Sequence, residues 1–152
     1  MKVLTKSAKI EEATDYDEIL NFAFDNGVEY DEENKRYVNK PYLGFKLLLD
    51  NKMIGAVSIC KSELGDYVLE NLAILKEFRH KGYATMLIEY VFNKLKSLKI
   101  SEIYLIAHVY GIYEKTGFCF TNEKQYLISN NCSNCELYKT KECIPRVMVK
   151  KL

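Results

Sequence analysis

The segment Arg79-His80-Lys81-Gly82-Tyr83-Ala84 places three basic side chains beside a glycine, at a point where the sequence pattern changes. Residues 67–74 before it are typical of a strand. After it, apolar residues follow helical spacing, namely Ala84, Leu87, Ile88, Val91, Phe92, Leu95 and Leu98. A helix that begins at such a turn presents backbone N–H groups and the positive end of its dipole to anions. The segment therefore predicts a phosphate-binding turn. The alternative is an ordinary helix-start glycine beside a solvated basic face.

Three cysteines near the end of the chain, Cys132, Cys135 and Cys143, form the pattern C-x2-C-x7-C. Two thiolates at C-x2-C spacing can bind one tetrahedral zinc ion. A fourth ligand must then come from elsewhere in the chain, and the candidates are His108, Cys60, Cys119 and His80. Iron–sulfur ligation, free thiols and a reversible disulfide in this loop are the alternatives to zinc.

The order strand, R-x-x-G-x-A and amphipathic helix resembles the acyl-CoA signature of the GNAT acetyltransferase superfamily. A second segment, from Gly111 to Phe118, is similar to the Y-E-K-x-G-F segment of the same superfamily and follows at the expected distance. The resemblance covers residues 9–128 and 144–151. It implies that acetyl-CoA is the cosubstrate and that the second substrate is an amine.

The resemblance also implies which residues contact acetyl-CoA. Backbone groups of Leu72, Ala73 and Ile74 would pair with the pantetheine amides. The turn that follows would hold the pyrophosphate through Arg79, His80, Lys81, Gly82, Tyr83, Ala84 and Thr85.

Tyr113 matches the family tyrosine that commonly protonates the departing CoA thiolate. A phenol with an ordinary pKa of about 10 can donate a proton to a thiolate of similar basicity. Most tyrosines are packed aromatics, and this chain has 12 of them. The prediction therefore depends on the position of Tyr113 within the second motif.

Two residues compete for the role of general base. Glu70 stands just before the predicted pantetheine-binding segment, and period-two alternation places it on one face with Val68 and Leu72. The opposite face then carries Leu69, Asn71 and Ala73. His108 follows the fifth strand, and histidine side chains in general can exchange protons near neutral pH. If His108 binds zinc, it cannot act as the base. The connection from Ala107 to Tyr113 is shorter than in many family members and lacks their Asn.

Composition narrows the class of protein. With 152 residues the chain is long enough for one domain, residues 1–152, that includes the Cys-containing loop at 130–143. A net charge of +1 argues against broad nucleic-acid binding. The first residues lack the apolar core of a signal peptide, and no stretch has membrane-spanning length. We expect a cytoplasmic protein with no membrane partner.

The pattern of elements predicts an α+β fold. Strands are expected at 9–14, 45–50, 53–61, 66–74, 102–107, 118–128 and 144–151, and helices at about 15–26, 82–98 and 110–116. By resemblance this is the GNAT fold, a mixed and mostly antiparallel sheet flanked by helices. Its fourth and fifth strands splay apart to admit the pantetheine arm.

These observations favour an acetyl-CoA-dependent N-acetyltransferase that moves an acetyl group to a primary amine by direct attack in a ternary complex. The acidic residues within 28–41 would suit a cationic acceptor. The alternative is a non-catalytic acyl-CoA-binding sensor or scaffold module that is regulated by metal or redox chemistry at the Cys loop. A homodimer is also compatible with the resemblance.

Overall fold

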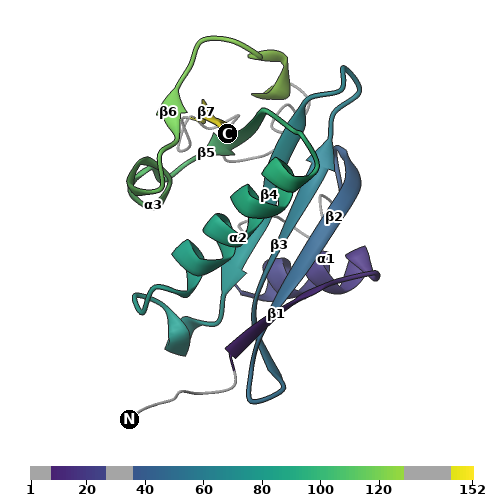
Figure 1. Ribbon diagram of the computed structural model, residues 1–152, viewed down its shortest axis with the longest axis vertical. Coiled ribbons are helices and arrows are strands. Elements are labelled where there is room, and N and C mark those ends of the chain that lie inside the picture. Colours follow the sequence, from purple (N-terminus) through teal and green to yellow (C-terminus); the bar gives the residue numbers. More distant parts are fainter. Residues whose placement is uncertain (1–7, 27–35, 129–144) are drawn as a thin grey trace.

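The computed structural model describes residues 8–26, 36–128 and 145–152. It contains one seven-stranded sheet with the strand order β1-β2-β3-β4-β5-β7-β6 (Figure 1). The strands are β1 Ala8–Glu12, β2 Lys40–Leu49, β3 Lys52–Lys61, β4 Tyr67–Ile74, β5 Glu102–Ala107, β6 Cys119–Phe120 and β7 Arg146–Lys151. The helices are α1 Tyr16–Asp25, the short 3-10 helix η2 Lys76–Phe78, α2 Tyr83–Ser97 and α3 Gly111–Lys115.

The β2–β3 hairpin turns at Asp50 and Asn51, which have φ of 51° and 68°. Both residue types tolerate the left-handed region, and two consecutive positive φ values match the twist that a two-residue hairpin needs. The predicted hairpin around residues 50–52 is therefore confirmed, with strands longer than expected.

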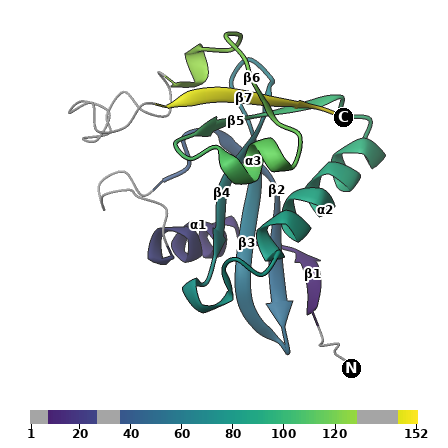
Figure 2. The same cartoon turned by 90° about the vertical axis from the view of Figure 1, so that its left-hand side faces the viewer.

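Helices α1 and α2 cover opposite faces of the sheet (Figure 2). Asp15 caps α1, because its Oδ1 accepts hydrogen bonds from the N–H groups of Asp17 at 3.1 Å and Glu18 at 3.3 Å. The buried side of α1 carries Ile19, Leu20 and Ala23. The buried side of α2 carries Leu87, Ile88, Val91, Phe92 and Leu95. Both helices thus show the apolar stripe that their sequences predict.

Strands β4 and β5 are parallel but barely joined. Among the residues described, their ladder contains one pair, Val68 with Tyr104. The neighbouring pairs are extensive and antiparallel, β3 with β4 on one side and β5 with β7 on the other. Beyond Val68 the two strands diverge, and β5 and β7 run across the direction of β2 and β3 (Figure 2). The splayed fourth and fifth strands expected from the sequence are confirmed.

A β-bulge interrupts β4 and corrects the predicted alternation of its side chains. The register shifts between Ala56 and Ser58 of β3, and Asn71 has a φ of 58°. Asn71 Nδ2 donates to Ser58 Oγ at 3.3 Å, so Asn71 lies on the α1 face, as Glu70 does. Leu72 instead packs against the cluster on the α2 face. The extra residue of a bulge changes the face of every residue that follows, so the prediction that Leu72 shares a face with Val68 and Glu70 is wrong.

The sixth strand is also shorter than the predicted span of 118–128. After Phe120 the chain turns, and Thr121 Oγ1 accepts a hydrogen bond from the N–H of Glu123 at 3.1 Å. Lys124 then has a φ of 60°, and its carbonyl accepts a hydrogen bond from the N–H of Leu127 at 3.1 Å. A threonine hydroxyl that accepts from the backbone in this way competes with strand pairing. The apolar residues beyond it are therefore placed by turns.

The core has three parts. The largest cluster fills the space between the sheet and α2 and includes Phe45, Val57, Leu69 and Leu87. A small cluster of Ala13, Ile19 and Ala56 lies under α1. The third cluster, Val68, Tyr104, Leu127 and Val147, surrounds the one β4–β5 pair. It packs β4 against β5 and β7 at the point from which β4 and β5 diverge. No helix within the described ranges has the length and apolar character needed to cross a membrane.

Candidate active site

The candidate site begins where β4 and β5 part. Glu70 follows the last paired residue, Val68, by two positions and is aligned with Ser58 on the α1 face of β3. It is therefore the first residue of β4 on this face after the pairing ends. The backbone of Leu72, Ala73 and Ile74 continues along β4 beyond the last pair with β5. The predicted pantetheine contacts thus lie along the edge that faces the β4–β5 gap.

The predicted phosphate turn forms the start of α2. Gly82 is its N-cap with a φ of 90°, a left-handed backbone conformation that residues other than glycine rarely adopt. The first intrahelical bond runs from the N–H of Met86 to the carbonyl of Gly82 at 3.0 Å. The N–H groups of Tyr83, Ala84 and Thr85 precede it, and no side chain of the described residues caps them. These three N–H groups form an anion-binding site of the kind that the sequence predicts, called the anion seat below.

Arg79 connects this turn to two neighbouring elements. Its Nε donates to the carbonyl of Ile74 at 2.8 Å, and its Nη2 donates to the carbonyl of Asn26 at 2.6 Å. The guanidinium thus ties the end of β4 to the end of α1 and fixes the path of the turn. His80, with a φ of 62°, and Lys81 are exposed. Their side chains provide the basic character of the turn.

The carboxyl group of Glu70 lies in a polar cluster on the α1 face. Asn39 Nδ2 donates to Glu70 Oε2 at 2.8 Å. Burial raises the pKa of Glu70 to about 7, and the hydrogen bonds from Asn39 and Cys60 oppose that rise. A carboxyl group that titrates near neutral pH can accept a proton from an amine and release it to water.

The rest of this polar cluster is neutral at physiological pH. Burial raises the pKa of the Cys60 thiol, and the charge of Glu70 raises it further. Burial also raises the pKa of Tyr37, whose hydroxyl donates to the carbonyl of Tyr16 at 2.7 Å. A buried, protonated thiol is a poor nucleophile and a poor metal ligand. Glu70 is thus the group of the cluster that changes charge near pH 7.

Tyr113 lies on α3, the helix that follows β5. Its half-buried ring packs against Phe118 with the centroids 5.8 Å apart and the planes at 82°. Burial raises the pKa of Tyr113 to about 12, so the phenol carries its proton at neutral pH. Tyr113 packs on the large cluster of the α2 face, whereas Glu70 lies on the α1 face. A protonated phenol and a carboxyl group with a raised pKa thus lie on different faces of the split sheet.

The remaining predicted residues lie elsewhere. His108 is exposed and comes directly after β5. Cys132, Cys135 and Cys143 lie outside the described residues. Within the part of the chain that is described, no three His, Cys, Asp or Glu side chains are grouped so as to hold a metal ion. Cys60 is buried in β3 and Cys119 is exposed in β6, both as free thiols.

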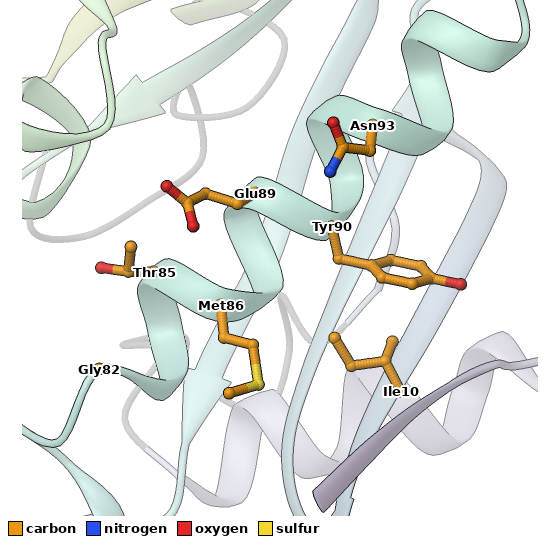
Figure 3. Close-up of a pocket in the computed structure, with 7 residues that line it drawn as sticks. All are labelled: Ile10, Gly82, Thr85, Met86, Glu89, Tyr90 and Asn93. Carbon is orange, nitrogen blue, oxygen red and sulfur yellow. The ribbon is translucent and has the colours of Figure 1, made fainter.

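A groove of about 460 Å³ runs along the outer face of α2 (Figure 3). Its lining consists of Ile10, Gly82, Thr85, Met86, Glu89, Tyr90 and Asn93. The groove meets the anion seat at Gly82 and Thr85 but continues on the side of α2 that faces β1. Glu70 and Tyr113 do not line it. The groove is therefore a surface feature next to one end of the β4–β5 gap and separate from these two candidate residues.

Two polar residues of the site were not predicted. Asn39 binds the carboxylate of Glu70, and Ser58 Oγ donates to the backbone carbonyl of Glu70 at 3.0 Å. Asn39 stands in a polar stretch and Ser58 in an apolar strand, with no motif around either. The alternation of β3, which puts Ser58 and Cys60 on one face, was the one available signal for Ser58.

Comparison with known proteins agrees with this geometry. Residues 9–118 match the sequence model of the acetyltransferase (GNAT) family. The chain therefore belongs to this family. It is also 29% identical, over 104 residues, to an uncharacterized N-acetyltransferase of Chlorobaculum tepidum. The aligned part covers 66% of this chain and 65% of that relative, so the chain spans just under two thirds of the relative's length.

Solved structures show the same fold. A GNAT family acetyltransferase from Elizabethkingia anophelis with acetyl-CoA bound superposes with a TM-score of 0.69 at 16% identity, over 95% of this chain and 98% of that one. A putative streptothricin acetyltransferase from Bacillus anthracis in complex with acetyl coenzyme A gives a TM-score of 0.63 at 17% identity, over 96% and 98%. Both neighbours hold the same cosubstrate on this fold.

Proposed function

We propose that this protein transfers the acetyl group of acetyl-CoA to a primary amine. The observation that carries the proposal is the open N-terminus of α2, with Gly82 at a φ of 90°, next to the gap that opens after the Val68–Tyr104 pair. The open N–H groups of α2 can bind a pyrophosphate, and the unpaired edge of β4 can hydrogen-bond to amide groups. Together they suit a long molecule with a pyrophosphate and two amide groups. Two such neighbours were solved with acetyl-CoA bound.

Glu70 and Tyr113 have complementary roles in the proposed reaction. Glu70 accepts a proton from the ammonium form of the acceptor, directly or through water. The neutral amine nitrogen attacks the thioester carbonyl carbon, the C–S bond breaks, and Tyr113 donates its phenolic proton to the sulfur. The acylated nitrogen then loses its second proton, which returns to the Tyr113 phenolate through water, and Glu70 releases its own proton to the solvent. The pKa values of about 7 for Glu70 and about 12 for Tyr113 leave each group in the required state at pH 8. His108, exposed beyond β5, is the competing base.

The acceptor class follows from charge. Glu70 gains a negative charge as the pH rises through about 7, and it lies on the face that α1 covers. A cationic amine is attracted to that charge and gives up a proton to it. We therefore place polyamines, aminoglycosides and lysine side chains first among the acceptors.

A thiol-release assay with acetyl-CoA tests the proposal, run against simple amines, polyamines, aminoglycosides and peptide N-termini. Calorimetric titration of CoA runs beside it. Release of CoA that depends on one of these amines would support the enzyme. Tight CoA binding without release by any amine would favour a non-catalytic acyl-CoA-binding module. No CoA binding at all would overturn both readings of the site.

A further inference from the structure

Asn39 reaches from the segment before β2 to the candidate base on β4. Its Nδ2 lies 2.8 Å from Glu70 Oε2, and the residue is only 5% exposed. The Asn39 end of the bond is therefore shielded from water, while Glu70 itself is half-buried. A buried amide donor aimed at a carboxylate restricts its orientation and favours its ionised form.

The other groups around Glu70 do not have this effect to the same degree. Cys60 on β3 and Tyr37 before β2 are the titratable neighbours among the described residues, and both are neutral at pH 7. Cys60 also hydrogen-bonds to Glu70 and lowers its pKa, but by less than Asn39 does. Ser58 donates to the backbone carbonyl of Glu70 and not to its carboxylate. No lysine or arginine of the described residues forms an ion pair with Glu70. Asn39 is thus the main group that opposes the cost of burying the charge.

We propose that Asn39 is a positioning residue for acetyl transfer, whose side-chain amide holds the Glu70 carboxylate ionised beside the β4–β5 gap. The inference rests on the proposed function, because Glu70 is the base in that reaction. It assigns a role to a residue outside both sequence motifs.

Asn39→Leu tests the inference, because leucine has nearly the shape of asparagine but cannot donate. Loss of one hydrogen bond to a charged group should raise the pKa of Glu70 by about one unit. The acidic limb of the pH profile of kcat/KM should move up by the same amount. With the fastest amine of the panel, kcat/KM should fall roughly tenfold at pH 6 and stay within about twofold at pH 9.

Asn39→Asp is the second variant and covers the case in which leucine disturbs folding. It places another carboxyl group beside Glu70, and the two then titrate as a pair with one apparent pKa raised. Asn21→Leu, on the exposed side of α1, is the matched control and should change neither the pKa of Glu70 nor the profile.

Carbon-13 NMR of the full-length protein with labelled glutamate measures the pKa of Glu70 without any acceptor. Glu70→Gln identifies the signal. An unchanged pKa of Glu70 in Asn39→Leu would overturn the inference. A shifted pKa with an unchanged acidic limb would show that Glu70 is not the base, which overturns the positioning role as well.

A double variant separates this inference from the proposed function. In a Glu70→Gln background, Asn39→Leu should lower kcat/KM no further, because its effect acts through Glu70. A further loss would mean that Asn39 acts by itself and would contradict the inference. Absence of turnover with every amine would contradict the proposed function, while the NMR arm would still show whether Asn39 sets the ionisation of Glu70.

Discussion

At the residue scale, two effects on the ionisation of Glu70 oppose each other. The proposed role as a base requires an ionised carboxylate, whereas partial burial disfavours ionisation. The folded protein raises its pKa to about 7, mainly by burial. In the unfolded chain a glutamate titrates near 4.3. Between these two values the folded state binds the extra proton, so the free energy of unfolding falls as the pH rises from about 4 to about 7. The candidate active site thus costs stability at the pH where it works.

Glu70→Gln should remove this cost. At pH 8 we expect the variant to have a free energy of unfolding about 1–3 kcal/mol higher than the unmodified protein, and at pH 4 about the same. Urea unfolding at pH 4, 6 and 8 measures the difference. Glu77→Gln, an exposed glutamate of η2, is the control and should stay within about 0.5 kcal/mol at every pH. A gain that did not depend on pH would contradict the raised pKa.

Tyr113→Phe removes one hydroxyl and keeps the ring that packs on Phe118. If this hydroxyl protonates the CoA thiolate, kcat should fall by about 100-fold or more, with CoA affinity unchanged within about twofold. Stopped-flow thiol release and calorimetry measure the two quantities. The control is Tyr126→Phe, since Tyr126 also has a raised pKa but bonds Asp66 at the turn before β4, away from the gap. Equal losses of activity in both variants would argue against a specific role for Tyr113.

At the scale of elements, Gly82→Ala tests the α2 anion seat. A Cβ at Gly82 meets no atom within 4 Å, so the substitution acts through the φ of 90° alone. A left-handed alanine costs about 1–2 kcal/mol of stability, or the turn shifts and the N–H groups leave their positions. We expect CoA affinity to fall by roughly tenfold or more, since charge-assisted hydrogen bonds are lost. Calorimetry and thermal unfolding measure both effects.

Gly65→Ala is a closely matched control for this experiment. Gly65 has a φ of 89°, also with nothing within 4 Å of a Cβ, but lies in the β3–β4 turn. The loss of stability should be similar, while CoA affinity should not change. If Gly65→Ala weakened CoA binding as much as Gly82→Ala, the anion seat at α2 would not be supported.

The sequence predicted the elements that repeat a simple pattern and missed those where one residue breaks it. The strand expected at 102–107 and the helix expected at about 15–26 match the structure, because their apolar periodicity continues to both ends. Asn71 looks like any polar strand residue, yet its positive φ turns Leu72 to the other face. That conformation is set by pairing with β3, including the bond to Ser58, which no local pattern shows. Likewise the chain leaves β6 at Thr121 through a side-chain hydrogen bond.

The candidate site likewise has parts that the sequence could predict and parts that it could not. The phosphate turn and Tyr113 stand in contiguous motifs, so their residue types and order could be predicted from the sequence. The surroundings of Glu70 could not, because Asn39 and Cys60 come from other parts of the chain and meet Glu70 only after the sheet has formed. Its pKa depends on that burial. A sequence alone could therefore name Glu70 and His108 as rival bases but could not distinguish their environments.

At the scale of the whole molecule, the sheet consists of two halves with few links. Strands β1–β4 form one half and β5, β7 and β6 the other, and the ladder between them has one described pair, Val68 with Tyr104. The small cluster around this pair and the large cluster under α2 hold the halves together. A ligand that lies in the gap and hydrogen-bonds to β4 would add contacts where the sheet has none. Binding should therefore stabilise the fold as well as present the thioester.

Amide hydrogen exchange with and without acetyl-CoA measures this effect directly. At a concentration 100 times the dissociation constant, binding should raise the free energy of unfolding by about 2.7 kcal/mol and the midpoint of thermal unfolding by roughly 5–10 °C. Exchange should slow most in residues 72–74 of β4 and 82–85 of α2, and little in the β2–β3 hairpin. Glu70→Gln should keep this protection, because it removes a proton acceptor and no proposed CoA contact. Protection confined to 82–85 would mean that the phosphates bind at α2 without the pantetheine entering the gap. The reaction geometry proposed between Glu70 and Tyr113 would then be wrong.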